Sequence, residues 1–357
     1  IGEGNAEYKG RVVPVAEAIS EAGLRPVSLG GKEGLALING TAVMNAVGTL
    51  AVADSVLVAK TADVVAAMSL EALRGVPYAF DARTHALRPY KGQGDAASNV
   101  RRIIEGSEII ERHKRDRVQD AYSLRCVPQV HGASRDAFGY VRSVMEVELN
   151  SVTDNPLIFK SGEEGVALSG GNFHGQPLAL AMDFFGIAAA ELGSISERRQ
   201  ARLVDASLSG LPPFLTEVPG LNNGFMIPQY TSAALVSENK VLAHPSSVDS
   251  IPTSANQEDH VSMGGYAARK AAEILNNTRK VLAIEMLLAA QALDFAQAEA
   301  PRPATGRGTR AAHERIRSVV PHLGKDEYLH PLISRLVTLA ESGGVVEAVE
   351  EAVGELD

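Results

Sequence analysis

The chain has 357 residues, with 34 Lys and Arg against 43 Asp and Glu, which gives a formal net charge of −9. This acidic balance argues against a surface that binds nucleic acid or an anionic membrane. The chain is 45% hydrophobic but only 5% aromatic, and it contains no Trp. Such a composition favours helices packed through small side chains over a β-sandwich, so we predict an all-α fold.

A single cysteine, Cys126, excludes an intramolecular disulfide framework and predicts a reducing, cytoplasmic location. We find no signal peptide and no apolar run of about 18 residues, so no membrane span is expected. The opening "IGEG" has no Met and resembles the tail of an element already under way. We therefore expect an upstream segment that this sequence does not include.

Apolar residues at helical spacing predict a series of helices separated by Gly-rich or polar breaks. No alternation of strands and helices occurs, so a doubly wound sheet is excluded, and long helices of this kind usually form bundles shared between subunits. Two domains are expected, a helical bundle over 1–300 and a C-terminal segment over 301–357 with two short helices. The predicted helices span 11–25, 42–75, a segment up to about 117, 134–152, 178–204, 229–244 and 262–298, whereas 81–99 reads as polar turns.

Several common catalytic motifs are absent from the sequence. It contains no phosphate-binding loop, no CxxC, no HExxH and no GxSxG, and its nine histidines include no pair at i, i+4. We therefore predict no metal site. The remaining candidates are polar loops at breaks between helices, where a bundle can build a pocket.

Three of these loops carry isolated polar or aromatic residues. Asn39 in "LINGT" is either a turn former or an amide that fixes a reacting group. Asn155 in "TDNP" precedes a proline and is either a cap or a site residue, and Phe173 in "GGNFHG" either plugs the core or lines a pocket. From these stretches alone, both interpretations of each residue remain open.

The other two loops are richer in chemistry. In "VQDAYSLR", Gln119, Tyr122 and Arg125 would fall along one side of a helical turn. Arg125 needs an anion, which is either an internal acid or a bound carboxylate. In "TSANQEDHVSMG", Glu258 and Asp259 either favour a helix N-terminus or form part of a site, and five consecutive polar side chains exceed what a cap requires.

Taken together, the stretches resemble the aromatic amino acid lyase family, and within it most closely the members that act on histidine. The resemblance rests on "KEGLALINGT", "VQDAYSLRCVPQVHG", "SVTDNPLI", "GGNFHG" and the long stretch over 222–264, in this order from residue 1 to about 300. It implies a homotetramer of long helices whose active sites draw on more than one subunit. The expected partners are an amino-acid substrate, further copies of the chain and its own N-terminal segment.

The family removes ammonia from an amino acid with an electrophile, 4-methylidene-imidazole-5-one (MIO), formed autocatalytically from an internal Ala-Ser-Gly. Ala-Ser-Gly does not occur in this sequence. The resemblance therefore implies that the electrophile lies on the missing upstream part, with this chain as the C-terminal two-thirds. An electrophile is needed because a β-hydrogen of the substrate is barely acidic and an ammonium group leaves poorly.

The resemblance also implies roles for the candidate residues. Asn39 and Tyr122 would act beside the electrophile and the amine, together with Gln119. Arg125 would clamp the substrate carboxylate with Asn155 beside it, and Phe173 would pack against the electrophile or the substrate.

Glu258 would select the substrate, with a part in proton transfer. A carboxylate accepts the N–H of an imidazole, whereas it would be left unpaired against a phenyl ring. The phenylalanine and tyrosine lyases typically carry a neutral amide at the corresponding position. The alternatives are a phenylalanine or tyrosine ammonia-lyase or 2,3-aminomutase, and a non-catalytic helical fragment.

Overall fold

The computed structural model describes residues 1–162, 164–298 and 300–357. The chain forms two compact units, each made of segments that are far apart in the sequence. Unit 1 consists of Ile1–Ala42 and Ser151–His174, and unit 2 consists of Val43–Asn150 and Gly175–Asp357. The expected division at residue 300 stays a prediction.

Unit 1 contains two antiparallel hairpins and two short helices, so the all-α expectation does not hold for this part. Its elements are β1 (Asn5–Tyr8), β2 (Arg11–Pro14), α1 (Val15–Glu21), α2 (Glu33–Ala36), β3 (Leu157–Ser161) and β4 (Glu164–Leu168). The predicted helix over 11–25 is wrong in its first turn. Lys9 and Gly10 both have positive φ, 51° and 74°, and such a two-residue turn joins paired strands.

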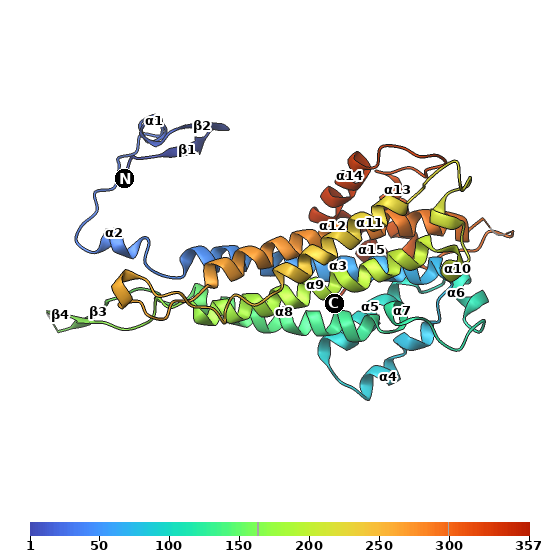
Figure 1. The fold of residues 1–357 in the computed structure, drawn as a ribbon, viewed down its shortest axis with the longest axis horizontal. Coiled ribbons are helices and arrows are strands. Elements are labelled where there is room, and N and C mark those ends of the chain that lie inside the picture. Colours follow the sequence, from blue (N-terminus) through green and yellow to red (C-terminus); the bar gives the residue numbers. More distant parts are fainter. Residues whose placement is uncertain (163, 299) are drawn as a thin grey trace. The chain divides into compact units, whose positions relative to one another are not determined.

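Unit 2 is a bundle of long helices that run side by side in Figure 1. They are α3 (Ala42–Ala72), α8 (Val127–Leu149), α9 (Gln176–Val204), α11 (Met226–Leu242) and α12 (Gly264–Ala296). The predicted long helices are confirmed to within three residues at each end, except that α8 begins at Val127, seven residues before the predicted start at 134. With 33 residues, α12 is about 50 Å long at the usual rise per residue.

Shorter elements surround the bundle. The helix α5 (Lys91–Ile103) begins inside the stretch 81–99, where polar turns were expected, because its apolar residues Ala96, Val100 and Ile103 are fully buried. Where this helix packs against α8, a Cβ added to Gly132 would lie 2.3 Å from the backbone nitrogen of Gln93, so only glycine fits at this position. The shorter elements are η1 (Pro77–Phe80), α4 (Ala82–Ala86), α5 (Lys91–Ile103), α6 (Glu108–His113), α7 (Tyr122–Arg125), α10 (Ala206–Ser209), η2 (Pro213–Leu215), η3 (Ser254–Asn256), α13 (Arg307–Arg317), α14 (His330–Glu341) and α15 (Gly344–Val353).

Two helices, α3 and α9, are long and apolar enough to cross a membrane by length and composition alone. The expectation that the chain has no apolar run long enough to span a membrane is therefore wrong by this criterion. Both helices bury charged side chains that have partners within the protein, including Asp63 on α3 and Arg199 on α9. Core helices of a bundle meet the same length and hydropathy criterion.

A fully buried ion pair joins three of the long helices. The Nε of Arg199 on α9 donates to Oε1 of Glu285 on α12 at 2.6 Å, and its Nη2 donates to Oε2 at 2.8 Å. The hydroxyls of Ser69 on α3 and Ser196 on α9 donate to the same carboxylate, at 2.7 and 2.6 Å. Each oxygen of Glu285 thus accepts two hydrogen bonds, which compensates for the loss of water around the carboxylate.

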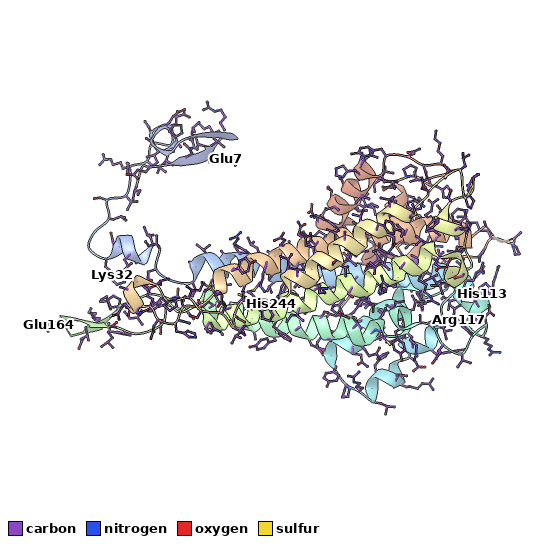
Figure 2. All side chains as sticks on the ribbon, in the orientation of Figure 1. Glu7, Lys32, His113, Arg117, Glu164 and His244 are labelled. Carbon is purple, nitrogen blue, oxygen red and sulfur yellow. The ribbon has the colours of Figure 1, made fainter. Side chains whose placement is uncertain are left out.

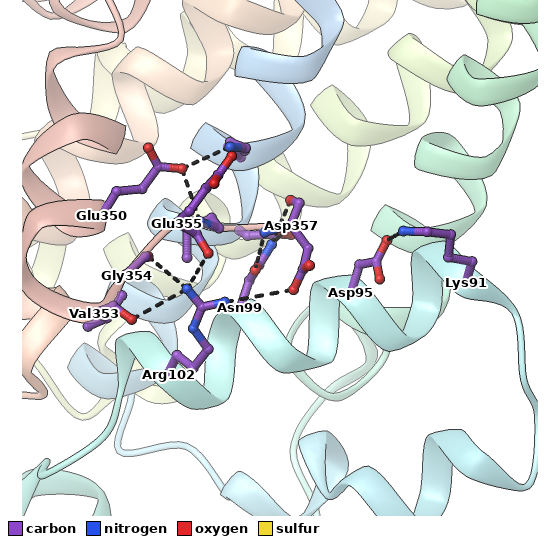
Figure 3. A network of polar contacts seen from close by, with 12 residues as sticks. Lys91, Asp95, Asn99, Arg102, Glu350, Val353, Gly354, Glu355 and Asp357 are labelled. Carbon is purple, nitrogen blue, oxygen red and sulfur yellow. Dashed lines mark hydrogen bonds and ion pairs between the residues drawn. The ribbon is translucent and has the colours of Figure 1, made fainter.

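A second buried carboxylate, Asp63 on α3, connects the bundle to the C-terminal residues. Burial raises the pKa of Asp63, but the charge of Arg135 and the hydrogen bond with His131 outweigh this and hold it below its usual range. Asn99 donates to Asp63 at 2.9 Å and accepts from the backbone N–H of Asp357 at 2.9 Å. Figure 3 shows this contact beside Arg102, which donates to the carbonyl of Gly354 at 2.7 Å.

We expect Arg199→Met to lower the free energy of unfolding by about 3–5 kcal/mol, because it leaves Glu285 charged and buried without a cation. The measurement is urea unfolding followed by circular dichroism. Lys91→Met is the control, since Lys91 pairs with Asp95 on the surface of α5 and should leave the urea midpoint almost unchanged. Equal midpoints for Arg199→Met and wild type would show that the pair does not stabilise the bundle.

Burial raises the pKa of Glu71 on α3 to about 7, and the N–H of Gly306, at 3.0 Å, offsets this only in part. The folded state therefore holds a proton that the unfolded state has lost between pH of about 4.5 and 7, so stability falls as pH rises through this window. In Glu71→Gln this contribution is absent, and the variant should gain up to about 3 kcal/mol relative to wild type between pH 5 and pH 8. Unfolding free energies measured across this range test it. Glu351→Gln, at an exposed position on α15, should keep the wild-type slope, and an identical slope for Glu71→Gln would contradict the assignment.

Candidate active site

Unit 1 brings two of the predicted amides to one carboxylate. Asn39 lies between α2 and α3, and its Nδ2 is 3.5 Å from Oδ1 of Asp154. The backbone N–H of Asn155 donates to the same oxygen at 2.6 Å. The side-chain oxygen of Asn155 accepts from the N–H of Gly170 at 2.7 Å, so its NH₂ group faces away from this hydrogen bond. Phe173, the third predicted residue in unit 1, is half-buried in the loop after β4.

The loop before α8 carries the second group of predicted residues. Tyr122 and Arg125 lie on α7, a helix of only four residues, whereas Gln119 precedes it in irregular backbone and is exposed. The expectation of one helical side is therefore wrong for Gln119. Asp120 anchors this turn, since it accepts from the N–H of Val76 at 2.6 Å and from Nε of Arg117, labelled in Figure 2, at 2.5 Å.

Arg125 has no ion-pair partner among the residues that the structure describes. Its guanidinium carbon lies 4.6 Å from the centre of the Tyr122 ring, and its Nε is buried without a hydrogen-bond partner. The alternative of an internal acid is thus contradicted. A guanidinium held on one face by an aromatic ring, with its donors unused, is suited to a carboxylate from outside the chain.

Glu258 lies in an exposed loop that is held by unusual backbone geometry. Ser254, Ala255 and Asn256 have φ of 50°, 54° and 66°, a conformation that side chains rarely adopt and that is often found at functional sites. The Thr253 hydroxyl donates to Oε2 of Glu258 at 2.6 Å. This hydrogen bond, followed by that from Ser254, holds the pKa of Glu258 below its usual range.

The helix N-terminus does not explain this acidic stretch. The first residue of α12 is Gly264, and no acidic residue lies in its first turn. Glu258 therefore precedes the helix by six residues and is outside the reach of the N–H groups that favour acids there. The loop positions Glu258 without using it as a cap.

Arg125 and Glu258 lie toward opposite ends of unit 2, as Figure 1 shows for α7 and the loop between α11 and α12. Gly264, the first residue of α12, lies beside Met44 near the start of α3. His131, near the start of α8, bonds to Asp63 farther along α3. The nineteen residues from Met44 to Asp63 correspond to about 30 Å along the helix. Since α8 runs antiparallel to α3, Arg125 is farther still from Glu258, and a single chain does not bring them into one cavity.

The predicted site residues do not line the cavity beside α14 in unit 2. That cavity, of about 790 Å³, lies between α11, α12 and α14 and is lined by Phe225, Ile284, Tyr328 and Ile333, among others. Over the described part of the chain, no group of three or more His, Cys, Asp and Glu could hold a metal ion.

Sequence reasoning missed three side chains that hold these loops: Lys32, Asp120 and Asp154. Each lies within a quoted motif, but only the structure shows its partner. Asp120 and Asp154 are charged residues directly next to a predicted site residue, which is a signal in the sequence, whereas Lys32 is seven positions from Asn39 and has no such signal.

Residues 1–318 match the aromatic amino acid lyase family. A protein named histidine ammonia-lyase from Alkaliphilus oremlandii is 55% identical over 99% of this chain and 68% of its own length. The crystal structure of histidine ammonia-lyase from Trypanosoma cruzi superimposes with a TM-score of 0.90 at 43% identity, over 99% of this chain and 66% of that one. A tyrosine aminomutase from Streptomyces globisporus gives a TM-score of 0.92 at 39% identity, over 100% of this chain and 71% of that one.

The chain thus spans about two thirds of the length of these relatives. Both the long-helix fold and the matched residues agree with the resemblance drawn from the polar loops. This chain belongs to the aromatic amino acid lyase family, whose ammonia-lyases break carbon–nitrogen bonds.

Proposed function

We propose that the full-length protein containing this chain is a histidine ammonia-lyase, which converts L-histidine to urocanate and ammonia without oxidation. The observation that carries the proposal is the 55% identity, over nearly the whole chain, to a protein of that name. Glu258 adds the preference for an imidazole, because its carboxylate accepts an N–H that a phenyl ring does not have. The cytoplasmic location remains a proposal.

The residues of the chain fit roles around a carboxylate and an amine. Arg125, whose buried Nε has no hydrogen-bond partner among the described residues, would bind the substrate carboxylate, and the NH₂ group of Asn155 would bind beside it. Tyr122 and Gln119 would face the amine, and Phe173 would pack against the reacting end. These assignments stay predictions.

The MIO group would supply the electron-poor centre that makes the amine a leaving group. Its precursor Ala-Ser-Gly is not in this sequence, so the group would come from the upstream segment. The amide of Asn39 fits a place beside it, because an N–H donor stabilises negative charge that develops during the reaction.

We infer that each active site is assembled from several copies of the chain, in a homotetramer. Arg125 and Glu258 are too far apart to act in one chain, and Glu258 is exposed there. The long helices also carry exposed apolar side chains that a second copy could cover, and exposed apolar groups of this extent mark interaction surfaces. They include Leu50 and Val56 on α3, Tyr140 and Val147 on α8, Leu180, Phe184 and Ile187 on α9, and Val241 on α11.

There are two alternative functions, namely an enzyme that acts on another amino acid and a protein without catalytic activity. A lyase or aminomutase acting on tyrosine is supported by the 39% identity to the tyrosine aminomutase. A non-catalytic helical module would bind copies of itself and turn over nothing. The full-length protein is incubated with histidine, phenylalanine or tyrosine. Ultraviolet detection of the conjugated acid that a lyase forms, together with chromatographic detection of the β-amino acid that an aminomutase forms, separates the three functions.

Glu258→Gln should lower kcat/KM for histidine by about 100-fold, because a neutral amide accepts the imidazole N–H more weakly than a carboxylate. Activity with phenylalanine should not fall in parallel. Asp259→Asn, at the neighbouring exposed position, is the matched control and should keep most of the activity. Unchanged histidine turnover in Glu258→Gln would refute the substrate assignment.

Hybrid oligomers test the shared site. We expect full-length Arg125→Met and Glu258→Gln proteins each to lose most activity alone, and co-expression of the two to restore a substantial part of it. Restoration follows because some sites in a mixed tetramer receive a wild-type residue from each subunit. If the co-expressed mixture remains as inactive as the separate variants, the two residues act within one chain or not in one site.

A further inference from the structure

We propose that Asp154, held by Lys32, is a positioning residue that sets the orientation of the Asn39 amide and of the backbone at Asn155. The proposal deepens the proposed function and rests on it for the role of Asn39. It concerns contacts within unit 1 alone.

The carboxylate of Asp154 is the centre of a small polar network. Its Oδ2 forms an ion pair with Nζ of Lys32, and its Oδ1 faces both Nδ2 of Asn39 and the N–H of Asn155. The side chains of Lys32 and Asp154 are only 27% and 19% exposed, so water competes weakly for these groups. One carboxylate therefore joins the two segments that carry the predicted amides.

The backbone at Gly40 shows that this contact is built into the fold. Gly40 has φ of 153°, and a Cβ there would lie 2.2 Å from the carbonyl oxygen of Thr153. Only glycine allows the segment after Asn39 to approach the segment before Asp154 so closely. Lys32 itself has φ of 70°, which is unusual for a residue with a side chain.

An ionised carboxylate fixes which way an amide points. It only accepts hydrogen bonds, so Asn39 must turn its NH₂ group toward Asp154. A neutral amide at position 154 could present either a donor or an acceptor, and Asn39 could then flip. The hydrogen bond from Lys32, the leading cause, holds the pKa of Asp154 below its usual range and keeps it ionised.

Lys32 has a second effect on the site. An unpaired carboxylate 3.5 Å from the Asn39 amide would oppose negative charge developing on the far side of that amide. The ammonium group cancels this charge while leaving the hydrogen bond to Asn39 intact. The pair therefore orients Asn39 without adding net charge next to the reaction.

The test compares full-length wild-type protein with Asp154→Asn, Lys32→Met and Lys32→Arg. We expect Asp154→Asn and Lys32→Met each to lower kcat at least tenfold with KM changed less than threefold, because a small misplacement of a catalytic group costs rate more than binding. The double variant should be no worse than either single one, since both remove one unit. Lys32→Arg should retain at least a third of kcat.

The matched control is Asp95→Asn, which removes a carboxylate from an exposed pair with Lys91 on α5 and should leave kcat unchanged. A second readout does not depend on activity: neutron crystal structures, which distinguish amide N from O, should show the NH₂ group of Asn39 facing residue 154 in wild type and flipped or rotated away in Asp154→Asn. If Asp154→Asn does not fold, Lys32→Met and Lys32→Arg decide the question.

A kcat of Asp154→Asn within twofold of wild type, or an Asn39 amide that keeps its orientation, would overturn the positioning role. If the wild-type protein does not deaminate histidine, the proposed function fails, and the crystallographic comparison still decides whether Asp154 orients Asn39.

Discussion

The ion pair between Arg199 and Glu285 is the constraint on which the rest of unit 2 depends. The facing surfaces of α9 and α12 are rich in Ala and Leu, and such side chains fill space in several axial positions with similar energy. A guanidinium and a carboxylate that are both fully buried can meet in only one of them, because any shift leaves two charges without partners. Ser69 extends the same requirement to α3.

Fixing the axial position of these helices also fixes the two ends of the bundle. α7 and its Arg125 lie toward one end, and the loop with Glu258 precedes α12 at the other, with about 30 Å or more of helix between them. A sliding error of one helical turn would displace a loop by about 5 Å, more than a hydrogen bond tolerates. A site assembled from loops of different copies therefore requires helices whose axial positions are fixed by buried polar contacts, as they are in this chain.

The sequence predicted the long helices well, because apolar spacing over twenty or more residues leaves few alternatives. It failed where a short feature decides the structure. Lys9 and Gly10 adopt a turn that converts the start of a predicted helix into a strand, and α5 is helical although it contains two glycines, because its apolar face is buried. Both outcomes depend on local backbone geometry or on partners far away in sequence.

For the candidate site, the sequence predicted types of residue better than their environment. Arg125 is predicted to need an anion, and no acid among the described residues forms an ion pair with it, but its distance from Glu258 could not follow from a motif. The exposure of Glu258 likewise could not follow from a motif. The link from Lys32 through Asp154 to Asn39 joins segments that are more than a hundred residues apart in the sequence. Sequence spacing carries no information on such distances.

Glu258 differs in its surroundings from four other carboxylates of the chain that are buried or paired with a cation. Glu285 and Asp63 are buried and neutralised by arginines, Asp154 is neutralised by Lys32, and burial favours the protonated form of Glu71. Glu258 is held by hydroxyl groups alone and makes no ion pair among the described residues. Hydroxyls fix its orientation and favour its ionised form but do not cancel its charge. Its remaining acceptor positions are therefore directed outward and suited to an N–H donor, which is what an imidazole ring presents and a phenyl ring does not.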